Sequence, residues 1–178
     1  MSRINLLDNE AIPEDLRASL KKAKKRFGVV PNIGKVYATW PEYYRVYWDK
    51  FSTVMADDSD ISKRMKLMIM SLVGSLNQCQ YAYFWNQMLL RQDGASPEEI
   101  NVTLGCDFRN SGLDVATKAA LGYAEKITNQ PYAITDREVE RLKEHFNDRQ
   151  IFEIAAVASF ANEMTRMAAA LGLQLESR

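Results

Sequence analysis

The chain has 178 residues, of which 47% are hydrophobic and 26% are charged, a composition typical of a folded globular protein rather than a disordered one. Lysine plus arginine number 23, as do aspartate plus glutamate, so no overall field attracts the chain to nucleic acid or to an anionic membrane. No apolar run reaches the roughly 18 residues of a membrane-spanning helix. From the charge balance and the short apolar runs together, neither a nucleic acid nor a membrane is an expected partner.

Apolar residues recur at helical spacing along almost the whole chain, and nothing alternates with a period of two for long. Helices are predicted over residues 14–26, briefly after Pro31, over 41–55, over 62–94, from "SPEEI", within "LDVATKAALGYAEKIT", from "TDREVERLKEHF", and from about 148 to 171. The 62–94 stretch is either two helices or one helix bent near residues 74–78. We therefore predict one all-α domain over residues 1–178, with about seven or eight helices and the aromatic-rich pair near its middle most deeply buried.

The cysteine and histidine content limits the possible chemistry. Cys79 and Cys106 are too far apart for a C-x-x-C pair and make no disulfide framework. The first residues alternate charge and apolar character too closely for a signal peptide, so a reducing, cytoplasmic location is expected. The single histidine, His145, argues against a His-based metal site or a Ser-His-Asp triad unless His145 itself takes part. No metal and no cofactor is expected.

Five segments occur in a familiar order: "FGVVPNI", "LNQCQYA", "GASPEEI", "ALGYAEKIT" followed by "ITDREVERL", and "IFEIAAVASFANEMTRMAAALG". Over about residues 27–175 this order resembles the alkylhydroperoxidase D-like and carboxymuconolactone decarboxylase superfamily, in particular its peroxidase-related branch. The resemblance implies the alkylhydroperoxidase D-like helical fold. It also implies a homo-oligomer, as a dimer, trimer or hexamer.

The redox motif of that superfamily is degenerate in this chain. Its redox members carry Glu, eleven residues, Cys, two residues, Cys, three residues and His, which fall here on Leu67, Cys79, Ala82 and Asn86. Alanine is no nucleophile, leucine is no base, and asparagine has no proton that titrates near pH 7. The decarboxylase branch keeps a histidine at the place of Asn86, so it is not matched either. Dithiol alkylhydroperoxidase activity is therefore not expected.

Two residues of this region remain as candidate catalytic groups. Asn86 either orients a carbonyl or carboxylate of a ligand or makes a structural hydrogen bond. Cys79 either forms a sulfenic acid alone or packs as a small apolar residue, and no Lys, Arg or His in its own turn would lower its pKa. Cys106 and His145 are interpreted as a packing residue and a surface residue.

A pocket beside Asn86 is the last prediction. Cys79 and Asn86 are two helical turns apart and point the same way, and aromatic residues follow Cys79 directly. Asn162 and Arg166 lie one turn apart on the last predicted helix, where Arg166 either clamps a carboxylate or forms an ion pair. The expected pocket residues are Tyr81, Ala82, Tyr83, Trp85, Tyr44, Trp48, Leu67, Asn162 and Arg166.

The function expected from the resemblance is that of a divergent carboxymuconolactone decarboxylase-like protein. It would act on or bind a small organic carbonyl, lactone or carboxylic acid compound in a helical pocket, without the dithiol mechanism. Whether it is an enzyme is left open, with the resemblance favouring one. The alternatives are a non-catalytic ligand-binding or assembly protein, and a weak single-cysteine peroxidase that uses Cys79.

Overall fold

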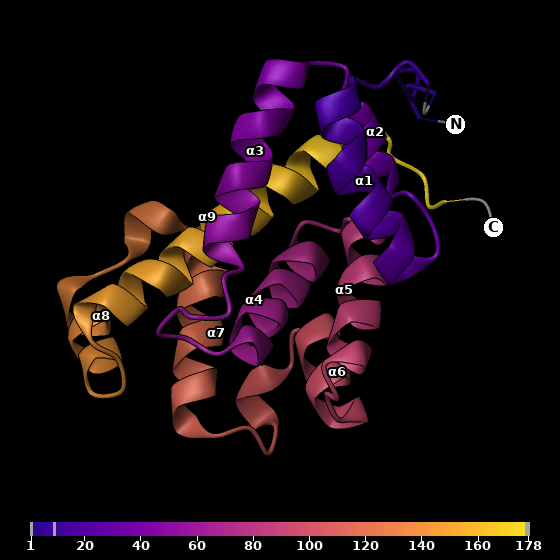
Figure 1. Cartoon of the computed structure of the whole chain (residues 1–178). Helices are drawn as coiled ribbons and strands as arrows, with labels where there is room; N and C mark the ends of the chain where they lie inside the picture. The colour runs from indigo at the N-terminus through magenta and orange to yellow at the C-terminus, as the bar shows by residue number, and fades with distance from the viewer. Residues whose placement is uncertain (1, 9, 177–178) are drawn as a thin grey trace. The chain divides into compact units, whose positions relative to one another are not determined.

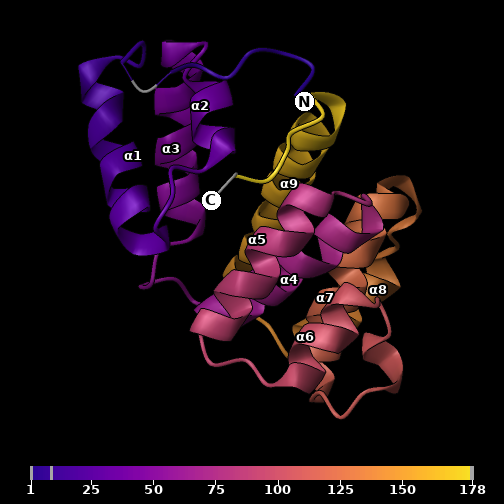
Figure 2. The same cartoon turned by 90° about the vertical axis from the view of Figure 1, so that its right-hand side faces the viewer.

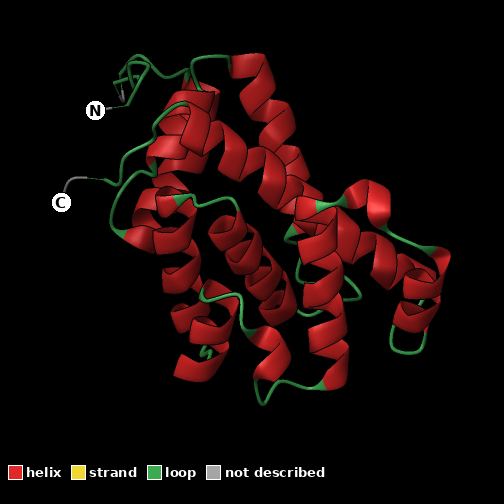
Figure 3. Cartoon of the chain, turned by 180° about the vertical axis from the view of Figure 1, so that it is seen from behind, coloured by secondary structure: helices red, strands yellow, loops and turns green. Residues whose placement is uncertain are grey.

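The computed structural model describes residues 2–8 and 10–176, and Figure 1 shows them as helices joined by loops. The elements are α1 (Glu14–Phe27), α2 (Asn32–Tyr37), α3 (Pro41–Val54), α4 (Lys63–Leu76), α5 (Gln80–Gln92), α6 (Pro97–Leu104), the 3-10 helix η1 (Phe108–Asn110), α7 (Val115–Asn129), the 3-10 helix η2 (Pro131–Ala133), α8 (Asp136–Lys143) and α9 (Asp148–Ala170). No strand occurs among these residues, as Figure 3 shows. The predicted all-α class is confirmed.

The chain divides into two compact units. The first comprises Met1–Thr53 and Ala168–Arg178, and the second comprises Val54–Met167. Most of α9 belongs to the second unit, and its end at Ala168–Ala170 belongs to the first. A single domain over residues 1–178 stays a prediction.

The first unit holds α1, α2 and α3, which Figure 2 shows as neighbouring helices. Gly34 allows α2 to approach α1, because a Cβ at this position would lie only 2.5 Å from Leu20 Cδ2. Tyr37 of α2 and Tyr47 of α3 pack edge to face, with ring centroids 4.3 Å apart. Small and aromatic side chains therefore join these three helices.

Helix α4 is the central helix of the second unit and contacts α5, α6 and α7. Its start is set locally, because Ser62 Oγ accepts a hydrogen bond from the Met65 N–H at 3.1 Å. Every residue from Lys66 to Gly74 is buried, so all sides of this part of the helix meet other side chains. A helix buried all round forms the core of its unit.

The link between α4 and α5 settles the alternative that the sequence leaves open. Asn77 ends α4, Gln78 takes a φ of 51°, and Cys79 is extended with φ −90° and ψ 97° before α5 begins. A non-glycine residue at positive φ is uncommon and breaks the helix. Residues 63–92 thus form two helices, and α5 runs antiparallel to α4, since Ala82 lies against Gly74 while Asn86 bonds to Met70.

Local capping defines the later helices of the second unit. Ser96 Oγ accepts from the Glu99 N–H at 3.1 Å, and the Glu99 carboxylate accepts from the Ser96 N–H at 2.7 Å, a capping box at the start of α6. Asp114 Oδ1 accepts from the Thr117 N–H at 2.9 Å at the start of α7.

In the part of the chain that is described, no helix has the length and apolar character needed to cross a membrane.

Candidate functional site

Cys79 lies at the N-cap of α5, directly after the turn that separates α4 from α5. Its N–H donates to the Gly74 carbonyl at 3.0 Å, and its side chain is almost fully buried. Burial raises the pKa of the Cys79 thiol, whereas the backbone N–H groups of Ala82 and Tyr81 lower it to a smaller extent. Because the thiolate is the nucleophile, a raised pKa makes Cys79 a weak one at neutral pH.

Ala82 and Asn86 form the contact between α5 and α4. A Cβ built on Gly74 would lie 3.3 Å from Ala82 Cβ and 3.4 Å from Asn86 Nδ2, so these side chains cover the glycine closely. Asn86 is 1% exposed, and its Nδ2 donates to the Met70 carbonyl at 2.9 Å. Of the two alternatives for Asn86, the structural hydrogen bond is the one for which the structure supplies a partner.

The predicted pocket residues near Cys79, Ala82 and Asn86 differ in how far they are buried. Leu67 is buried in α4, and Tyr81 and Trp85 are buried in α5 with ring centroids 6.3 Å apart. Tyr83 is 43% exposed. The aromatic run therefore supplies buried rings at positions 81 and 85 but presents position 83 to the surface, because successive helical positions point in different directions.

Asn162 belongs to a polar network that connects three helices of the second unit. Asn77 Nδ2 donates to Asn162 Oδ1 at 2.9 Å and to Thr165 Oγ1 at 2.8 Å, and Asn162 Nδ2 donates to Thr128 Oγ1 at 3.0 Å. Arg166 donates to the Thr128 carbonyl at 3.3 Å. The network ties the end of α4 to α7 and α9, and so supports the turn that carries Cys79.

Tyr44 and Trp48 belong to α3 in the first unit. Tyr44 is buried, its hydroxyl shares a 2.7 Å hydrogen bond with Ser19 Oγ of α1, and its ring stacks on Trp48 with centroids 6.2 Å apart. Burial raises the pKa of Tyr44, an effect that the Ser19 hydrogen bond opposes. Within their unit these two residues attach α3 to α1.

Lys66 is a buried cation that the sequence reasoning missed. It is 1% exposed, and its Nζ donates to the Ala56 carbonyl at 2.7 Å. Burial lowers the pKa of Lys66, and the carboxylates of Glu153, Asp57 and Asp58 partly oppose this. The signal available in the sequence is a lone lysine inside the apolar run "MKLMIM". A lysine with a solvated side chain would occur in such a run only on an outward-facing side of the helix.

A cavity of about 530 Å³ lies along α7 and α8, two helices that are in contact in the second unit. Arg109 of η1, Tyr123 of α7 and Arg141 of α8 contribute to its lining, together with the segment between α7 and α8. None of the sequence-predicted pocket residues lines it. Sequence reasoning missed this cavity because its walls come from η1, α7, α8 and the segment between these two helices, which carry no common motif.

Metal binding has no support from side-chain clustering. Among residues 2–8 and 10–176, no group of three or more His, Cys, Asp or Glu side chains could hold a metal ion. Cys79 and Cys106 are both free thiols.

Helices α4 and α5 pack together in the second unit, and Cys79 is the N-cap of α5. The chain has the alkylhydroperoxidase D-like fold that the sequence resemblance predicted, because it is similar over nearly its whole length to solved structures of that fold. No protein-family model matches the sequence, and no curated protein matches it at a significant level.

Three solved structures illustrate the likeness. An uncharacterized peroxidase-related protein from Silicibacter sp. TM1040 is 27% identical with a TM-score of 0.90, and the match covers 99% of this chain and 92% of that one. The alkylhydroperoxidase AhpD core of an uncharacterized peroxidase-related protein from Ralstonia eutropha JMP134 is 24% identical with a TM-score of 0.91, over 99% and 93%. The debrominase Bmp8 is 19% identical with a TM-score of 0.83, over 97% and 91%.

Proposed function

We propose that the chain is a divergent alkylhydroperoxidase D-like protein that binds a small organic carbonyl compound, lactone or carboxylic acid without the dithiol peroxidase mechanism. The observation that carries this proposal is the α4–α5 contact. The positions that correspond to the second thiol and the histidine hold Ala82 and Asn86, and these pack on Gly74 and bond to the Met70 carbonyl. Because the Asn86 amide already bonds to the backbone, we favour binding without turnover over catalysis.

A small organic ligand is supported by what this fold accommodates elsewhere. A cysteine-to-alanine variant of the debrominase Bmp8, 18% identical to this chain with a TM-score of 0.82, was crystallised in complex with 2,3,4-tribromopyrrole. That ligand is a small, flat molecule. We further propose a cytoplasmic protein, because two free thiols suit a reducing compartment.

Two measurements test the proposal. In the first, tert-butyl and cumene hydroperoxide are offered with dithiothreitol to the wild type and to Cys79→Ser, and we expect no sustained turnover by either protein. In the second, ligand-observed NMR is recorded with benzoate, γ-butyrolactone and acetophenone, and we expect at least one to bind. Turnover that survives Cys79→Ser, or no binding by any of the three compounds, would overturn the proposal.

A single-thiol peroxidase is the second candidate, favoured by the place of Cys79 at the N-terminus of α5. There the N–H groups of Tyr81 and Ala82 and the helix dipole favour a thiolate. The thiolate would attack a hydroperoxide, break its O–O bond and become a sulfenate, while the alkoxide leaves and takes a proton as the alcohol. The sulfenate takes up a proton, and a small thiol attacks the resulting sulfenic acid to form a mixed disulfide and water. A second small thiol then releases the Cys79 thiol and leaves as the small-molecule disulfide.

Thiol reactivity separates the two candidates. In a Cys106→Ser background, Cys79 is the only thiol. Because burial raises its pKa, we expect it to react with a chromogenic disulfide at pH 7 far more slowly in the native protein than in urea-unfolded chain. Peroxide turnover by the wild type that Cys79→Ser abolishes would establish the second candidate in place of the first.

A further inference from the structure

The cavity along α7 and α8 carries one uncompensated positive charge. Of its five charged lining residues, Arg109 is paired with Glu125 and Lys126 is paired with Glu138. The hydrogen bond from Lys126, and further ones from the Thr135 backbone and hydroxyl, lower the pKa of Glu138 to about 2, so this carboxylate stays ionised and neutralises its lysine. Arg141 is the fifth.

Arg141 has no ion pair or side-chain hydrogen bond within residues 2–8 and 10–176. The same holds for the side chains of Tyr123 and Asn129, which also line the cavity. A guanidinium, a phenol and an amide are thus available as hydrogen-bond donors at one place. The arginine fork matches the two oxygens of a carboxylate.

The rest of the lining suits an apolar body of limited size. Ala119, Gly122, Ile134 and Leu142 provide apolar surface, and a Cβ built on Gly122 would meet only Phe108 Cε2, at 3.9 Å. The volume of about 530 Å³ lies within the range of small-molecule sites. One uncompensated cation balances a monocarboxylate, whereas a phosphate carries more charge than the cavity neutralises.

We propose that the α7–α8 cavity binds a small organic monocarboxylate with a flat apolar body, and that Arg141 binds its carboxylate. The inference rests on the proposed function, because it specifies where the proposed small organic ligand binds and that this ligand is a carboxylate. Arg141 and the polar side chains around it fix the carboxylate, and the apolar lining of α7 and α8 covers the ring. The site is separate from Cys79 and Asn86, neither of which lines the cavity.

The test measures binding of benzoate, with uncharged benzamide as the matched ligand, by isothermal titration calorimetry and ligand-observed NMR. Arg141→Ala removes the cation, and Gly122→Leu fills the apolar part of the cavity. Arg137→Ala is the control, because Arg137 is an exposed arginine on the same helix that does not line the cavity. Circular dichroism checks that each variant is folded.

We expect benzoate to bind the wild type and Arg137→Ala equally, and benzamide to bind at least tenfold more weakly. Arg141→Ala should weaken benzoate binding by about tenfold, the effect of one lost charge-assisted contact. Gly122→Leu should abolish binding. Benzamide that binds as well as benzoate, or Arg141→Ala that binds like the wild type, would overturn the inference.

The outcomes also separate this inference from the proposed function. If benzoate binds the wild type, Arg141→Ala and Gly122→Leu alike, the protein binds small acids but at another place. If benzoate, γ-butyrolactone and acetophenone all fail to bind, both proposals fail. If benzoate does not bind and Arg141→Ala instead lowers the sedimentation coefficient, the cavity is a contact between copies of the chain and the inference is overturned.

Discussion

Lys66 places a charge inside the most buried helix of the second unit. Its ammonium donates to the Ala56 carbonyl, and burial is the largest effect on its pKa, in the downward direction. A buried ammonium loses much of its hydration, and its partners must replace that hydration. Lys66 therefore ties residue 56 to α4, but the cost of burying its charge offsets part of what this contact contributes.

The first prediction concerns the pH dependence that follows from Lys66. Because its pKa is lowered from 10.5 on folding, the unfolded chain binds more protons than the folded one as pH rises toward 10.5, and stability increases over that range. In Lys66→Met this increase should disappear. At pH 7 the free energy of unfolding should be unchanged or raised, by about 1–2 kcal/mol, because the buried charge is removed.

Urea unfolding at pH 7 and pH 10 checks this prediction. Lys63→Met is the control, since the Lys63 side chain on the same helix is 40% exposed. The Lys63 variant should retain the wild-type pH dependence. An equal rise of stability with pH in the wild type and in Lys66→Met would show that another group causes it.

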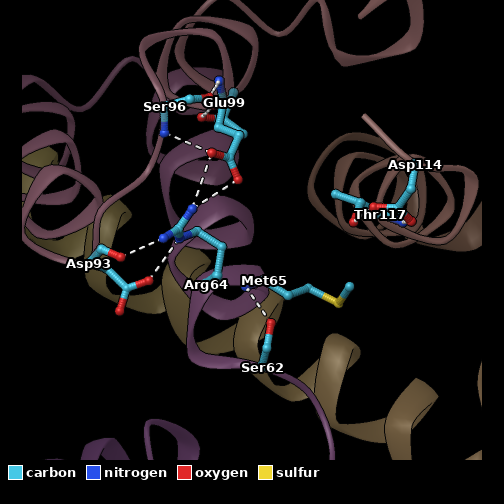
Figure 4. Close-up of polar contacts among 9 residues, drawn as sticks. Ser62, Arg64, Met65, Asp93, Ser96, Glu99, Asp114 and Thr117 are labelled. Atoms are coloured by element: carbon cyan, nitrogen blue, oxygen red, sulfur yellow. Dashed lines mark hydrogen bonds and ion pairs between the residues drawn. The ribbon is translucent and has the colours of Figure 1, made fainter. Parts of the chain in front are cut away.

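At the scale of the elements, Arg64 joins three segments at the start of α4. Its Nε donates to Asp93 Oδ2 at 2.8 Å, its Nη2 donates to the Asp93 carbonyl, and its Nη1 donates to both oxygens of Glu99 at 3.0 and 3.1 Å. Figure 4 shows the guanidinium between Asp93 and Glu99, with Glu99 also bonded to Ser96. One arginine thus attaches α4 to the end of α5 and the start of α6.

The second prediction is that Arg64→Ala lowers the free energy of unfolding by about 1–3 kcal/mol, because several charge-assisted bonds are lost in a partly buried site. Arg64→Lys should lose most of the same amount, since an ammonium cannot reach both partners in the fork geometry. The control is Arg45→Ala, which breaks the exposed Arg45–Asp15 pair and should lower stability much less than Arg64→Ala. Urea midpoints give the comparison, and wild-type stability in Arg64→Lys would contradict the proposed role of the fork.

At the scale of the whole molecule, large apolar side chains remain exposed in the described chain. Phe152 of α9 is 73% exposed, although the same helix buries Ile151 and Ile154 beside it. A single exposed apolar residue is ordinary on a protein surface, so Phe152 does not by itself indicate an interface. The homo-oligomer that the resemblance implies stays a prediction, and Phe152 is a residue through which to test it.

The third prediction is that the wild type sediments as an oligomer and that Phe152→Glu shifts it toward the monomer, because a carboxylate is costly to bury in an interface. Ser159→Glu is the matched control, two turns further along the same face of α9 and also exposed. It should change the sedimentation less. A wild type that sediments as a clean monomer at micromolar concentration would refute self-association.

The sequence by itself determined the helical class and most helix starts. Ser96 and Pro97 open α6, as the segment "SPEEI" predicts, because caps act within a few residues of the chain. The sequence alone shows that positions 82 and 86 hold alanine and asparagine, so these positions supply neither a thiol nor an imidazole. No structure is needed for this conclusion, because the reactive groups depend on residue type.

Only the tertiary structure decided which partner each candidate residue has. Asn86 was equally compatible with a ligand and with a structural bond, and the antiparallel packing of α5 on α4 placed the Met70 carbonyl beside its amide. The contact of Lys66 with the Ala56 carbonyl and the cavity beside Arg141 likewise depend on how separate segments pack together. Periodicity identifies the buried face of a helix, but the neighbour that covers it is set by long-range packing, which no local pattern encodes.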